Sequence, residues 1–120
     1  MTDILNIETA ADGRIAVVAF KAASINRAEE ITAAAEQIKD FIEENHPDRV
    51  VFDFAKVKFF SSQVLGLLLD IRARMETTNG QVVISAIDPH LHKVFRITNL
   101  DRIFQFFADR ENAVEAMSIN

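Results

Sequence analysis

Two adjacent serines interrupt an apolar stretch and are the leading candidates for residues that could do chemistry. Ser61 and Ser62 stand in the segment FFSSQVLG, between two phenylalanines and the apolar start of a helical pattern. A serine oxygen at the start of a helix can accept a hydrogen bond from a free backbone N–H, which is worth about 1 kcal/mol. The same place suits a phosphate, because free N–H groups and the helix dipole favour an anion there. The periodicity alone favours a helix cap over a phosphorylated serine.

Asp53 and Asp88 are a second candidate pair, near the carboxyl ends of predicted neighbouring strands. Open α/β sheets usually bind ligands at this edge, so a hydrolytic or small-ligand-binding protein would use such carboxylates. However, Asp53 lies within an apolar strand with no neighbouring histidine, and Asp88 precedes Pro89 as a helix cap would. Structural roles are therefore favoured for both aspartates. Because no nucleophile motif is recognisable either, we expect no enzymatic activity.

The three histidines do not form a plausible metal site. His90 and His92 are two apart on a predicted helix and point in different directions, and His46 is distant in sequence. The chain has no cysteine and no carboxylate cluster that would complete a set of ligands. Its three glycines form no phosphate-binding loop. We therefore expect no metal and no cofactor.

Hydrophobic periodicity divides the chain into strands and helices. Asp12 and Gly13 supply the chemistry of a tight hairpin, Asn26 and Glu29 have the spacing of a capping box, and Pro47 marks a helix end. The expected strands cover residues 4–9, 14–20, 49–54, 81–86 and 103–107, and the expected helices cover 26–46, 62–78, 111–117 and a segment opening at 88.

The order of these elements predicts an α/β fold. After the N-terminal antiparallel hairpin, every strand is followed by a helix, which is typical of parallel strands joined by crossovers. We expect a mixed sheet with about four helices, in which the apolar strand 49–54 is central. Nothing suggests a domain boundary, so residues 1–120 are expected to form a single domain.

Composition narrows the class of partner. The formal net charge is −5 and no cluster of lysine or arginine exists, which argues against nucleic acid. No stretch has the roughly 18 apolar residues of a membrane-spanning helix, so direct membrane insertion is not expected. The absence of cysteine and of a signal peptide pattern at the N-terminus favours the cytoplasm.

Phenylalanine is the only aromatic residue type besides histidine, and most of the ten phenylalanines follow core periodicity. Phe59 and Phe60 are consecutive, so their side chains cannot both point the same way in an extended segment. We expect Phe60 to stay at the surface as a contact residue.

The segment DFAKVKFFSSQVLGLLL resembles the signature segment of STAS domains, the fold of bacterial anti-sigma factor antagonists. The later VVISAIDPHLHKVFRITNLDRIFQFFADRENAVEAM resembles the rest of that family's pattern, so the likeness covers nearly the whole chain. The resemblance places the family's phosphorylated serine at Ser62 and its Leu-Gly pair at Leu65 and Gly66. Ser61 stands where the family usually has aspartate, and Ser24 stands where a loop aspartate is common.

The resemblance implies a binding module that is regulated by phosphorylation. Its partner would be an anti-sigma factor that is also a serine kinase of the GHKL type, and a serine phosphatase could restore the unmodified form. The implied contact residues are Ser24, Phe60, Ser61, Ser62, Gln63 and Gly66. The alternative keeps the fold but makes the protein a structural subunit of a signalling or transport assembly, with Ser62 only a helix cap.

Overall fold

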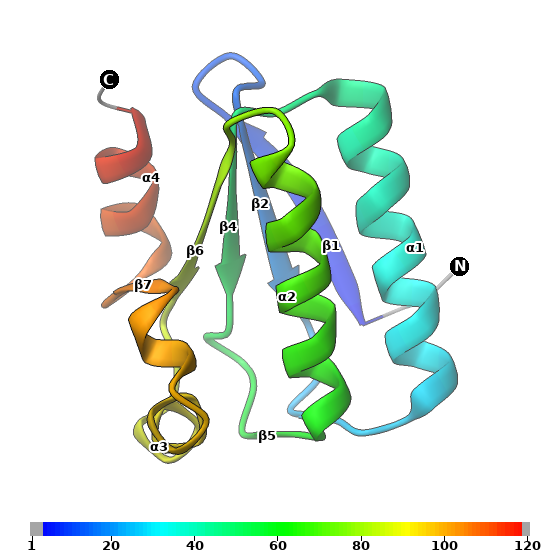
Figure 1. Ribbon diagram of the computed structural model, residues 1–120, viewed down its shortest axis with the longest axis vertical. Coiled ribbons are helices and arrows are strands. Elements are labelled where there is room, and N and C mark those ends of the chain that lie inside the picture. The colour runs from blue at the N-terminus through cyan, green and yellow to red at the C-terminus, as the bar shows by residue number, and fades with distance from the viewer. Residues whose placement is uncertain (1–3, 119–120) are drawn as a thin grey trace.

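The computed structural model describes residues 4–118, which form two β-sheets and four α-helices (Figure 1). The strands are β1 (Leu5–Ala10), β2 (Ile15–Phe20), β3 (Ser24–Ile25), β4 (Arg49–Asp53), β5 (Phe59–Phe60), β6 (Gln81–Ser85) and β7 (Gln105–Phe107). The helices are α1 (Ala28–Asn45), α2 (Ser62–Glu76), α3 (Pro89–Ile97) and α4 (Arg110–Ser118), with a short 3-10 helix, η1 (Leu100–Arg102).

The main sheet has the strand order β1-β2-β4-β6-β7 and confirms the mixed topology expected from the sequence. Strands β1 and β2 are antiparallel, whereas β2, β4, β6 and β7 are all parallel. Strand β4 lies in the middle, and its residues Val50, Val51 and Phe52 are completely buried. Its nearly continuous apolar sequence is therefore explained by helices on both faces of the sheet.

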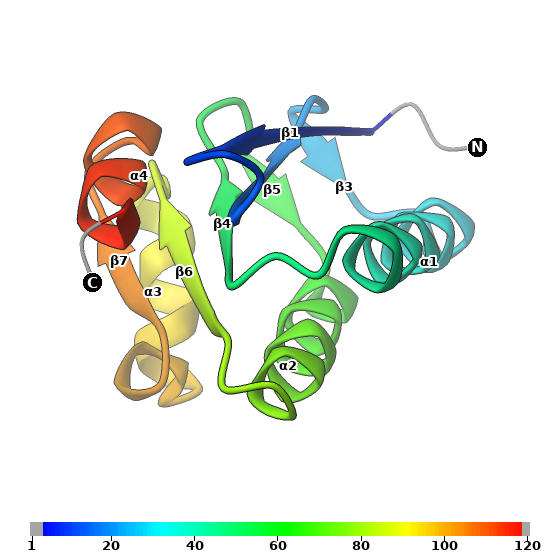
Figure 2. The ribbon, with the colours of Figure 1, turned by 90° about the horizontal axis from the view of Figure 1, so that it is seen from above.

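Helices cover the sheet unequally on its two faces (Figures 1 and 2). Helices α1 and α2 pack on one face, where alternate residues of β2, β4 and β6 join them in the larger core, together with Leu91 and Phe95 of α3. Helix α4 covers the other face and buries Ala113 and Met117 against Val51 and Val83. None of the helices within residues 4–118 is long and apolar enough to cross a membrane.

The turn between β1 and β2 confirms the expected hairpin. Ala11, Asp12 and Gly13 have positive φ angles of 54°, 58° and 86°, and the Arg14 N–H donates to the Ala11 carbonyl over 3.2 Å. A tight connection of antiparallel strands needs this left-handed backbone, which glycine and aspartate adopt most easily.

The helix ends agree only in part with the sequence signals. Asp88 caps α3 as expected, since its Oδ1 accepts a hydrogen bond of 2.9 Å from the His90 N–H. The capping box expected at Asn26 is wrong, because α1 begins at Ala28 after Arg27, which forms no side-chain cap. Helix α1 ends before Pro47, as predicted.

Three short elements escaped the sequence patterns. Strands β3 and β5, two residues each, form a small parallel sheet of their own. The 3-10 helix η1 shortens the last strand, which begins at Gln105 instead of residue 103. Elements of two or three residues are too short to show a hydrophobic period.

Gly80 is the glycine on which the packing depends, and this yields a test of the fold. A Cβ atom at Gly80 would lie 2.7 Å from Met75 Cε and 3.0 and 3.1 Å from the carbonyl oxygens of Met75 and Asp48. We expect Gly80→Ala to lower the free energy of unfolding by about 1–3 kcal/mol, because two backbone oxygens must move. Urea denaturation measures the change. Gly66→Ala is the matched control, since its Cβ meets nothing within 4 Å. Equal stability of the two variants would contradict this packing.

Candidate functional site

The loop from β4 to α2 is held in place by backbone hydrogen bonds to the segment around β3. The N–H groups of Lys58 and Phe59 both donate to the carbonyl oxygen of Ala23, over 2.8 and 3.0 Å. The Ser61 N–H donates to the Ile25 carbonyl oxygen over 2.9 Å. Since Phe59 and Phe60 also pair with Ser24 and Ile25, the start of α2 is fixed relative to the sheet.

Phe59 and Phe60 point in opposite directions, and the structure reverses the sequence expectation. Phe60 is 6% exposed, and its ring centroid lies 5.8 Å from that of Phe54 and 6.1 Å from that of Phe95. Phe59 is 53% exposed. The prediction that Phe60 stays at the surface is therefore wrong. Side chains alternate along a strand, and the core already contains Ile25, the partner of Phe60, so Phe59 faces outward.

The two serines differ in environment, and neither acts as the expected side-chain cap. Ser61 has the extended backbone of an N-cap residue, yet its side chain forms no cap hydrogen bond. Its Oγ is buried without a hydrogen-bond partner in the described part of the chain. The Ser61 carbonyl oxygen instead accepts from the Val64 N–H over 3.0 Å. Ser62, the first residue of α2, is exposed to solvent.

Most of the other expected contact residues lie on the surface around Ser62. Gln63 and Gly66 are exposed on the first two turns of α2, and exposed Ser24 is paired with Phe59. The exposed residues Ser24, Phe59, Ser62, Gln63 and Gly66 are called the Ser62 surface below. Phe59 was missed by the sequence analysis, because nothing in the sequence says which of two adjacent phenylalanines faces the core.

The electrostatic setting of Ser62 suits a negatively charged group. The first turn of α2 contains no acidic residue, and the N–H groups of Ser62 and Gln63, which precede the bonded N–H of Val64, have no earlier helical turn to donate to. The helix dipole adds a partial positive charge at this end. A phosphate on the Ser62 oxygen would therefore be met by donors instead of by carboxylates.

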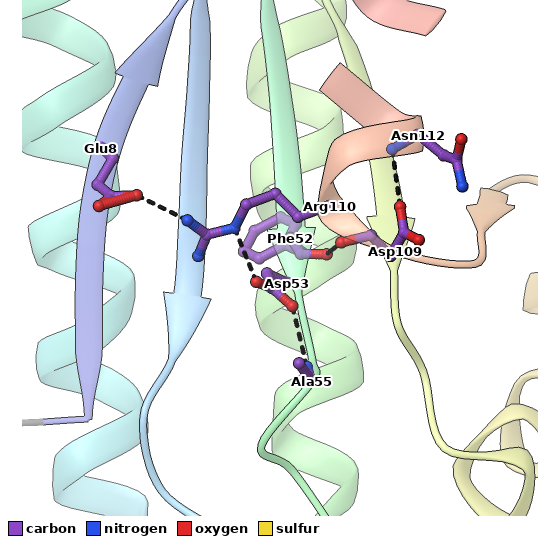
Figure 3. A network of polar contacts seen from close by, with 8 residues as sticks. Glu8, Phe52, Asp53, Ala55, Asp109, Arg110 and Asn112 are labelled. Carbon is purple, nitrogen blue, oxygen red and sulfur yellow. Dashed lines mark hydrogen bonds and ion pairs between the residues drawn. The ribbon is translucent and has the colours of Figure 1, made fainter. Parts of the chain in front are cut away.

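Asp53 belongs to a separate polar network on the α4 face of the sheet (Figure 3). Asp53, 7% exposed, accepts hydrogen bonds from the Ala55 N–H (3.0 Å) and from Arg110 Nε (2.9 Å). Arg110 Nη1 also donates to Glu8 over 2.7 Å. Burial acts to lower the pKa of Arg110, but the hydrogen bond and charge of Asp53, together with Glu8, more than offset this and raise it. Arg110 is thus a permanent cation that ties α4 to β4 and β1.

The carboxylates of Asp53 and Asp88 therefore both have structural partners, as expected from the sequence. Asp88 caps α3 and lies 3.8 Å from Lys58 Nζ. Arg110 was not foreseen as the partner of Asp53, because the two residues are 57 positions apart. A small cavity of about 160 Å³ adjoins this ion pair.

The histidine side chains do not come together in a single site. The His92 ring meets the Phe106 ring edge-on at 4.6 Å, and His90 is exposed. Across residues 4–118, no group of three or more His, Asp or Glu side chains could hold a metal ion.

The chain is similar to known proteins both in sequence and in fold. A curated relative, a putative anti-sigma factor antagonist BtrV from Bordetella bronchiseptica, is 31% identical over 68 residues, which are 57% of this chain and 59% of the relative. The unphosphorylated form of SpoIIAA, an anti-sigma factor antagonist, superposes with a TM-score of 0.83 at 18% identity, over 94% of this chain and 95% of the other.

Two further solved structures share the fold. The phosphorylated form of SpoIIAA, a Bacillus cell fate determinant, gives a TM-score of 0.74 at 19% identity, over 94% of this chain and 98% of that chain. A STAS domain protein from Planctomyces limnophilus gives 0.83 at 23% identity and 98% coverage of both chains.

The sequence model of the STAS domain matches residues 6–113, which include every strand of the main sheet except the first residue of β1. The match also covers the loop before α2 and all of the Ser62 surface. The chain therefore belongs to the STAS domain family.

Proposed function

We propose that this protein is an anti-sigma factor antagonist that binds a serine-kinase anti-sigma factor and is switched by phosphorylation of Ser62. The single observation that supports this most is the exposed hydroxyl of Ser62 at the first position of α2. The similar proteins also support this proposal. BtrV is described as a putative anti-sigma factor antagonist, and SpoIIAA has been solved in phosphorylated and unphosphorylated forms.

The switch follows from electrostatics at the start of α2. The kinase transfers the γ-phosphoryl group of ATP to Ser62 Oγ, the hydroxyl proton goes to a base of the kinase, and ADP leaves. The phosphate adds about −1.5 to −2 charge units to the Ser62 surface. The helix N-terminus tolerates this charge, so the fold is retained. A partner that covers the surface must bury the phosphate, which weakens the complex.

The reverse reaction completes the cycle. A serine phosphatase hydrolyses the exposed phosphate ester and restores binding. Because the kinase needs ATP, we place the protein in the cytoplasm. The contact residues are those of the Ser62 surface, with Phe59 in place of the buried Phe60 as the aromatic contact.

A second candidate function keeps the binding surface but drops the switch. Ser61 stands where the family pattern that the sequence resembles has an aspartate, and its hydroxyl is buried. An acid at that place would help orient the Ser62 hydroxyl or the metal ion of a kinase. Its absence favours a structural subunit of a signalling assembly in which Ser62 is never phosphorylated.

Phosphorylation can be assigned to one serine. We expect the wild-type protein, incubated with its cognate anti-sigma factor kinase and ATP, to gain one phosphate, and Ser62→Ala to gain none, because Ser62 is exposed at the start of α2 whereas the hydroxyl of its neighbour Ser61 is buried. Intact-mass spectrometry counts the phosphates. Ser61→Ala is the control and should still be phosphorylated. Phosphate that persists on Ser62→Ala would move the site elsewhere.

The charge effect can be tested without the kinase reaction. We expect Ser62→Asp to weaken binding to the anti-sigma factor at least about tenfold, or ~1.4 kcal/mol, because an uncompensated charge enters a covered surface. Isothermal titration calorimetry measures the affinity, with Ser62→Asn as the neutral control of similar size. An affinity for Ser62→Asp equal to that of Ser62→Asn would argue against a charge switch.

The opposite orientations of Phe59 and Phe60 predict opposite phenotypes. We expect Phe60→Ala to lower the free energy of unfolding by about 3–5 kcal/mol, because a buried ring is lost. Phe59→Ala should lower it by about 1 kcal/mol or less. It should instead weaken partner binding by more than about 1 kcal/mol, as expected for an aromatic contact. Denaturation and calorimetry on both variants decide this, and an unchanged affinity for Phe59→Ala would remove Phe59 from the interface.

A further inference from the structure

A groove between α1 and α2 begins where the Ser62 surface ends. It has a volume of about 430 Å³. Gln63 and Gly66 line its start and also belong to the Ser62 surface, so the two features are continuous. Leu67 and Ala35 contribute apolar wall, and the charged side chains of Glu36, Lys39 and Asp70 also line the groove. A partner that covers Ser62 would therefore reach this groove without crossing any other surface.

Gly66 keeps the groove open, and the fold does not need it. Glycine inside a helix is less stable than alanine because it loses more backbone freedom on folding. A Cβ atom at Gly66 would meet nothing within 4 Å, and its backbone does not need the positive φ that favours glycine. Gly80, by contrast, is required by close packing. The missing side chain at Gly66 thus creates space that no part of residues 4–118 fills.

The groove is flanked by a strongly acidic helix. Helix α1 carries six carboxylates and a single lysine, Lys39. That lysine forms an ion pair with Asp70 of α2, so its charge is already compensated. Glu36 lines the groove, and no lysine or arginine of the described residues forms an ion pair with it. An occupant of this groove is therefore favoured if it brings positive charge.

We propose that the groove between α1 and α2 receives an aliphatic side chain of the anti-sigma factor that is flanked by lysine or arginine. The aliphatic group lies over Gly66 and Leu67, and the flanking cation pairs with Glu36. This proposal rests on the proposed function and extends it, because it gives the antagonist a second contact that does not depend on Ser62. A second copy of this chain is a poor occupant, since the net charge of −5 makes two copies repel each other and the chain has no surplus of positive charge to offer.

The steric part is tested by filling the groove. We expect Gly66→Leu to fold and to weaken binding of the purified cognate anti-sigma factor at least about tenfold, because the added side chain occupies the space over Gly66. Gly66→Ala reports stability and should raise the melting temperature by a few degrees. Ala73→Leu adds similar bulk to an exposed position of α2 that does not line the groove, and it should bind as the wild type does.

The charge part is tested by neutralising one carboxylate. We expect Glu36→Gln to weaken binding several-fold at about 0.05 M salt and much less at about 0.5 M, because salt screens the lost attraction. Glu44→Gln is the control, since Glu44 is an exposed acid of α1 outside the groove. Equal effects of the two substitutions would assign the attraction to the helix as a whole and overturn the specific pairing with Glu36.

The outcomes separate this proposal from the one it rests on. If the wild type binds and is phosphorylated while Gly66→Leu binds equally well, the groove proposal fails and Gly66 is removed from the contact surface, but the phosphorylation switch at Ser62 stands. If Ser62 is not phosphorylated but Gly66→Leu still abolishes binding of the anti-sigma factor, the groove proposal stands and the switch fails. If the wild type binds no anti-sigma factor, both are overturned.

Discussion

The burial of the Phe60 ring is the contact on which the candidate site depends. Phe60 lies edge-on to Phe54 and Phe95, and Phe54 in turn contacts Phe20, so a row of aromatic rings runs from β2 through the core to α3. Ring contacts of this kind add to the burial of large apolar areas. Because Phe60 is fixed inward, its neighbour Phe59 must point outward, and α2 must begin two residues later with an exposed serine.

Three features around Ser62 lower stability, and they are gathered at one place. The Ser61 hydroxyl is buried without a partner, Phe59 is half exposed, and Gly66 lies inside a helix whose packing would accept alanine. By contrast, Ser85 donates to the Phe52 carbonyl oxygen, and a Cβ atom at Gly80 would crowd the carbonyl oxygens of Met75 and Asp48. Single departures also occur elsewhere, since Gln37 Oε1 is buried without a partner and Ile97 is 80% exposed. Three such features next to one another fit a surface on which recognition is favoured over stability.

Most of the fold, but only part of the candidate site, could be predicted from the sequence. Long apolar periods were enough to place α2 at Ser62 and to make β4 central, and the STAS pattern agreed with both. Three features could not be predicted from the sequence: the pairing of the two-residue strands β3 and β5, the inward direction of Phe60, and the contact of Arg110 with Asp53. Each is decided by packing between segments distant in the chain. The capping box at Asn26 failed because α1 begins at Ala28, after Arg27, which forms no side-chain cap.

The acid content of α1 also makes the molecule electrically one-sided. The surplus of six carboxylates over one lysine on this helix equals the formal net charge of the whole chain, −5, so the remaining residues are neutral in sum. A body charged on one flank has a large dipole moment, and the field of an approaching cation turns it before contact. At physiological salt this torque acts only over the last ~8 Å of approach. An approaching basic protein would thus turn this chain so that α1 faces it, and fewer relative orientations would be sampled before the two proteins bind.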